Sequence, residues 1–69
     1  MRMSSDSPWR VVYMAQSLPE LESVERMLTA EGFLVRGRTL EQAVSGAYEL
    51  CVLESEAREA RQLIIEKEF

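Results

Sequence analysis

The segment Ala47–Ile64, AYELCVLESEAREARQLI, constrains the fold more than any other part of the sequence. Over Ala47–Leu53 both alternating faces are apolar, with Glu49 as the single charged residue. The chain then passes, without glycine or proline, into an alanine-, arginine- and glutamate-rich helical run. A strand that is apolar on both sides is typical of the middle of a sheet, where both faces are covered. The helix is expected to pack on that sheet through a stripe of small and branched residues, namely Ala57, Ala60, Leu63 and Ile64.

Two further strands are predicted at Trp9–Ala15 and Phe33–Arg38, which are rich in β-branched and aromatic residues. The helix between them is expected to begin at Ser17, because Ser17 and Glu20 have the spacing of a capping box. Gly32 is placed to end this helix in a left-handed conformation. Its buried stripe is predicted to contain Leu21, Val24, Met27 and Leu28.

Two smaller features complete the predicted secondary structure. Residues 40–45 are predicted as a short helical turn or an irregular loop, since Thr39 and Gln42 again have capping-box spacing. Ser55 is expected to cap the last helix.

The predicted order is therefore strand, helix, strand, strand, helix. A strand-helix-strand unit takes a right-handed crossover, and the third strand can insert between the first two, antiparallel to both. This predicts an α+β fold, a ferredoxin-like split βαβ sandwich whose three-stranded sheet lacks the usual fourth strand and carries both helices on one face. Residues 1–8 are polar and end in proline, so they are predicted to be a mobile segment before a single domain at residues 9–69.

Composition restricts the classes of function. The chain has 69 residues, no histidine and one cysteine, Cys51, so neither an intrachain disulfide nor a Cys/His zinc site is expected. A core this small often needs support, and self-association as a homodimer is the support that remains. The net charge of −4 argues against nucleic acid and anionic membrane surfaces as partners. The sequence shows no signal peptide or membrane-spanning run, so a cytoplasmic location is expected.

No pattern of catalytic residues or phosphate-binding glycines is present, so a non-enzymatic protein without cofactor or metal is expected. Cys51 is interpreted as a small apolar core residue; the alternative is a thiolate activated by Arg36 or Arg38, as in a redox or thiol protein. The same two arginines, which flank Gly37, form a candidate site for an anionic ligand. The alternative is that they are solvated or form salt bridges to Glu49.

The sheet face opposite the helices is the main candidate interface with a second copy or another protein. Strict alternation turns Val12 and Met14 toward the helices. It places six residues on the opposite face: Trp9, Val11, Tyr13, Leu34, Cys51 and Leu53. Without a fourth strand, the edge of the first strand would also be open to pairing with another chain.

Residues 10–66 resemble one family. The segments VYMA, SLPELESVERMLTAEGF, SGAYELCV and EAREARQLI are similar to those of small bacterial domains of unknown function grouped as prokaryotic signal-transducing proteins. The resemblance implies a ferredoxin-like, PII-like fold and, by analogy with that fold, a role in signal transduction. The family typically shows ELWVP where this chain has Glu49–Leu53, so Cys51 and Leu53 replace its tryptophan and proline.

Overall fold

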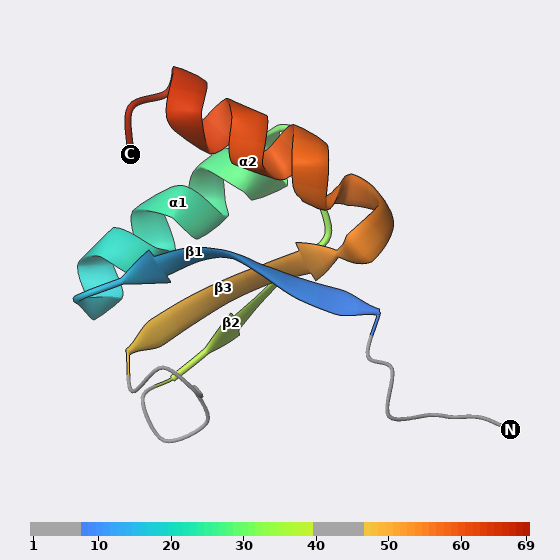
Figure 1. The fold of residues 1–69 in the computed structure, drawn as a ribbon. Coiled ribbons are helices and arrows are strands. Elements are labelled where there is room, and N and C mark those ends of the chain that lie inside the picture. The colour runs from blue at the N-terminus through green and yellow to red at the C-terminus, as the bar shows by residue number, and fades with distance from the viewer. Residues whose placement is uncertain (1–7, 40–46) are drawn as a thin grey trace, which may run out of the picture.

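The computed structural model describes residues 8–39 and 47–69 (Figure 1). Along the chain the elements are β1 (Trp9–Ala15), α1 (Leu18–Ala30), β2 (Val35–Arg38), β3 (Tyr48–Leu53), the 3-10 turn η1 (Glu54–Glu56) and α2 (Ala57–Glu66). The predicted order of strands and helices is confirmed, although β2 begins two residues later than expected. The turn predicted at residues 40–45 lies outside the described residues.

The three strands form one sheet in the order β1-β3-β2, and β3 is antiparallel to both neighbours. Both helices lie on the same face of this sheet (Figure 1). The predicted α+β arrangement is confirmed: within the described residues it is a ferredoxin-like split βαβ sandwich with a three-stranded sheet. The other face of the sheet is called the open face below; among residues 8–39 and 47–69, no helix or strand covers it.

The core lies between the sheet and the two helices. Leu50 and Val52 of β3 pack there against the apolar stripes of α1 and α2, and all three elements contribute fully buried side chains. The largest of these side chains are Leu28, Leu50, Val24 and Val52. The central position of β3 explains why its sequence is apolar on both sides, since all four of its inner residues, 49–52, are buried.

The predicted ends of α1 are confirmed. The Ser17 hydroxyl accepts a hydrogen bond from the backbone N–H of Glu20 at 3.3 Å, and thereby satisfies one free donor at the helix start. At the other end Gly32 has a φ of 98°, and the N–H of Phe33 donates to the carbonyl of Leu28 at 3.0 Å.

The predicted start of the last helix is wrong. Ser55 lies inside η1, and Glu56 occupies the N-cap position of α2 without a side-chain capping bond. The 3-10 turn forms this connection instead, and the N–H of Glu54 donates to the carbonyl of Pro8 at 2.7 Å. Pro8 is thus bonded to the domain, whereas the rest of the predicted mobile segment, residues 1–7, lies outside the described residues.

A β-bulge in β1 overturns the predicted alternation of this strand. Val11 lies opposite Cys51 and Tyr13 opposite Leu50, so Val12 is an extra residue between two consecutive positions of β3. Beyond the bulge each side chain changes face. Val12 and Tyr13 both pack against the core, and Met14, expected under the helices, lies on the open face with 57% of its surface exposed.

Candidate interaction surfaces

The open face carries most of the residues predicted for an interface. Register places Trp9 beside Leu53, Val11 beside Cys51, and Arg36 on the other side of Cys51. Leu34 directly precedes β2 and is 58% exposed. Tyr13 is the exception, because the bulge turns it to the helix side, and Met14 takes its place. The apolar side chains of this face are thus Trp9, Val11, Met14, Leu34, Cys51 and Leu53.

Tyr13 has a structural partner instead. Its hydroxyl donates to the Glu20 carboxylate, which also accepts the N–H of Gln16 at 3.2 Å. The hydrogen bond from Tyr13, and then that from Gln16, lower the pKa of Glu20. The same hydrogen bond is the main cause that raises the pKa of Tyr13, followed by burial and the nearby negative charge. Tyr13 and Glu20 therefore tie the end of β1 to the first turn of α1.

Cys51 lies in the centre of the open face and is fully buried. Burial raises the pKa of its thiol, and Glu49 adds to this effect, whereas Arg38 and Arg36 oppose it without reversing it. A reactive thiolate requires the opposite shift. The environment of Cys51 therefore favours the interpretation as an apolar packing residue over that of a redox or nucleophilic thiol.

Arg36 and Arg38 each have a partner within the domain. The Arg36 guanidinium lies over the ring of Trp9, 5.5 Å from the ring centroid, and the Arg38 guanidinium lies 3.5 Å from the Glu49 carboxylate. Glu49 is only 3% exposed, so its charge needs this compensation. The expected salt bridge to Glu49 is confirmed for Arg38. An anionic ligand at these arginines would have to compete with Trp9 and Glu49.

The outer edge of β1 carries features that hinder strand pairing. The Arg61 guanidinium of α2 donates to the Val11 carbonyl at 3.3 Å, next to the bulge. Arg10 forms an ion pair with Glu54 at 3.3 Å near the start of the strand. Bulges and charged side chains are both common means of protecting edge strands from other chains. The open face is therefore a better candidate interface than the β1 edge.

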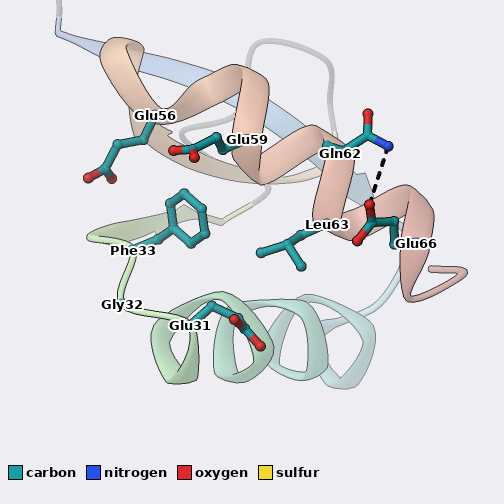
Figure 2. Close-up of a pocket in the computed structure, with 8 residues that line it drawn as sticks. All are labelled: Glu31, Gly32, Phe33, Glu56, Glu59, Gln62, Leu63 and Glu66. Atoms are coloured by element: carbon teal, nitrogen blue, oxygen red, sulfur yellow. Dashed lines mark hydrogen bonds between the residues drawn. The ribbon is translucent and has the colours of Figure 1, made fainter.

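A second surface, an acidic groove of about 460 Å³ between the helices, was not predicted from the sequence. Figure 2 shows how its residues converge from the segment after α1 and from one side of η1 and α2. They are Glu31, Gly32, Phe33, Glu56, Glu59, Gln62, Leu63 and Glu66. Sequence patterns placed Phe33 at the start of a strand and Leu63 in the buried stripe of the last helix, and they assigned no site to the glutamates.

Comparisons with protein families, curated proteins and solved structures found no match to this chain. No helix in the described part of the chain has the length and apolar character needed to cross a bilayer. Within the same residues, no group of three or more Asp, Glu or Cys side chains is arranged to hold a metal ion.

Proposed function

We propose that this protein is a non-enzymatic binding module that works through protein–protein contacts and forms a homodimer through its open face. The observation that carries the proposal is the exposure of Met14 and Leu34 on a sheet face that no described helix or strand covers. Soluble proteins seldom leave clustered apolar side chains exposed outside binding sites. In a domain this small, a second copy packed against the open face would also enlarge the hydrophobic core.

The residue types of the open face suit an interface. Trp9, Met14 and Arg36 belong to the three residue types that are enriched at interface centres, and Arg36 already covers part of the Trp9 ring. A twofold dimer would bring the same patch of each copy into contact, so each apolar residue of the patch would be buried on both copies. Within this proposal the role is signal transduction in the cytoplasm, in keeping with the resemblance to prokaryotic signal-transducing domains.

The test is sedimentation velocity on matched variants. Met14→Gln combined with Leu34→Gln should weaken dimerisation by at least about tenfold, because two exposed apolar contacts are lost from the interface. Ile65→Gln is the control, since Ile65 is 68% exposed on α2, away from the open face. The control should dimerise like the native chain. Equal association of all three proteins would exclude the open face as the interface.

A further inference from the structure

The outer edge of β2 is open to a further strand. β2 lies at one side of the sheet, and among residues 8–39 and 47–69 no strand pairs with its outer edge (Figure 1). Gly37, inside the strand, is exposed to solvent, and a glycine can expose only backbone. An edge strand turns every second N–H and C=O group outward, where the backbone of another chain can pair with them.

The two edges of the sheet differ in how they are protected. At β1 a bulge, a hydrogen bond from α2 and an ion pair hinder strand pairing. β2 instead pairs with β3 in regular register over Val35–Arg38. The arginines of β2 extend inward over the sheet, Arg36 to Trp9 of β1 and Arg38 to Glu49 of β3. Neither arginine side chain therefore lies across the outer edge of β2.

The charge of this edge selects the partner. β2 carries two positive charges, Arg36 and Arg38, and no negative one. In a twofold antiparallel pair of β2 strands, the arginines of one copy would lie opposite those of the other. Like charges that face each other across two strands destabilise the pair. The edge therefore disfavours a second copy of this chain and is complementary to a strand that carries carboxylates.

Both arginines can take a carboxylate. Arg36 is exposed, and within the described residues its guanidinium forms no hydrogen bond or ion pair besides its contact with the Trp9 ring. A bidentate pair with a carboxylate is stronger than an exposed cation–π contact, so an acid would draw Arg36 from Trp9 toward the edge. Arg38 reaches Glu49 through its Nη1 at 3.5 Å and keeps 31% of its side chain exposed.

We propose that the β2 edge binds an extended segment of a partner protein in which acidic and apolar residues alternate. The segment would pair with β2 as an added strand. Since alternate side chains of a strand share a face, its carboxylates would reach Arg36 and Arg38 on the open-face side. Its apolar side chains would lie on the helix side, near Val35 and Leu21 of the core region. The added strand extends the sheet sideways, whereas the proposed dimer uses the open face.

Fluorescence anisotropy with a short labelled peptide of alternating glutamate and valine tests the proposal. The native chain should bind this peptide at least about tenfold more tightly than the same peptide with glutamine in place of glutamate. Binding should weaken as salt is raised, because the arginines are partly exposed. Equal binding of the two peptides would overturn the proposal.

Two further peptides separate strand pairing from simple attraction of charges. In one, every backbone N–H is methylated, so that the carboxylates remain but the peptide cannot donate to β2. In the other, the glutamates are grouped at one end, so that they no longer share one face of a strand. Each should bind at least about tenfold more weakly than the alternating peptide. Undiminished binding of either peptide would overturn the proposal.

Arg36→Gln tests the site on the protein. This variant should bind the alternating peptide about tenfold more weakly, because one charge-assisted pair is lost. Arg58→Gln is the matched control, since it removes the same charge from an exposed position on α2, and it should change affinity by less than about twofold. Equal weakening by both variants would overturn the proposal, because net charge alone would then explain binding.

Circular dichroism confirms that both variants are folded, and the peptide comparisons use only the native chain. Anisotropy reports the peptide and sedimentation reports the dimer, so the β2 edge and the open face are tested separately.

Discussion

The Arg36 guanidinium stacks on the Trp9 indole from the opposite side of the central strand, 5.5 Å from the ring centroid. The two side chains come from the two edge strands, and β3 lies between them. Cys51 of β3 is paired with Arg36 on one side and with Val11 on the other, and it is fully buried although it is on the open face. The cation–π contact therefore joins the two edges of the sheet above its only cysteine.

Replacing Arg36 should expose Cys51. Arg36→Ala removes the cation–π contact and is expected to lower the free energy of unfolding by about 0.5–1 kcal/mol. It should also speed alkylation of Cys51, because the side chain beside the thiol is gone. Urea unfolding and the rate of iodoacetamide labelling measure the two effects. Arg58→Ala, on the exposed side of α2, is the control and should change stability by less than about 0.5 kcal/mol.

In the native chain the Cys51 thiol should resist alkylation at neutral pH until the protein unfolds. Burial raises its pKa, so the thiolate is scarcer than in an exposed cysteine. A cysteine introduced at exposed Thr29, in a Cys51→Ala background, should label quickly under the same conditions. Rapid labelling of native Cys51 would contradict the packing role and support the redox alternative.

The hydrogen bond between Tyr13 and Glu20 should make the protein less stable both in acid and in strong alkali. The folded pKa of Glu20 is lowered, so its contribution is complete above the pKa of the unfolded chain and is lost as pH falls through the folded value. The folded pKa of Tyr13 is raised, so its contribution is complete below the unfolded pKa and is lost as pH rises through the folded value.

Tyr13→Phe isolates this contribution. The variant should unfold at lower urea concentration than the native chain at neutral pH, and the difference should shrink in acid, where Glu20 is protonated, and in strong alkali. A difference that stays constant from acid to alkali would show that Tyr13 stabilises the fold through its ring alone.

Gly32 and Gly37 should respond differently to the same substitution. Gly32 has a φ of 98°, so Gly32→Ala places a side chain in left-handed backbone and should cost about 1–2 kcal/mol. Gly37 lacks this constraint, and an added Cβ would meet only the Leu21 side chain, at 3.4 Å. Gly37→Ala should therefore be neutral or slightly stabilising, as alanine is in a strand. Thermal unfolding measures the stability of both variants. An equal loss of stability in the two would contradict the assignment of Gly32 as the helix terminator.

Local sequence signals predicted the order of the elements well because each signal acts within a few residues. Ser17 and Gly32 fix the ends of α1 through their own hydrogen bonds and backbone angles. The apolar faces of β3 predicted its central place, where it pairs with β1 on one edge and with β2 on the other.

The open face was predicted only in part, because a bulge has no distinct signal in WRVVYMA. One extra residue at Val12 exchanges the faces of Tyr13 and Met14. The acidic groove was not predicted because its residues come from the segment after α1 and from η1 and α2, which meet only in the folded chain. Glu31 and Glu59, for example, lie far apart in sequence and resemble ordinary surface charges there.

Dimerisation through the open face is measured by light scattering coupled to size exclusion, on the native chain over a dilution series. We expect a species of twice the chain mass that dissociates on dilution, and the Met14→Gln, Leu34→Gln variant should dissociate at a higher protein concentration than the native chain. A single-chain mass at every concentration would contradict the claim that the open face joins two copies of this protein.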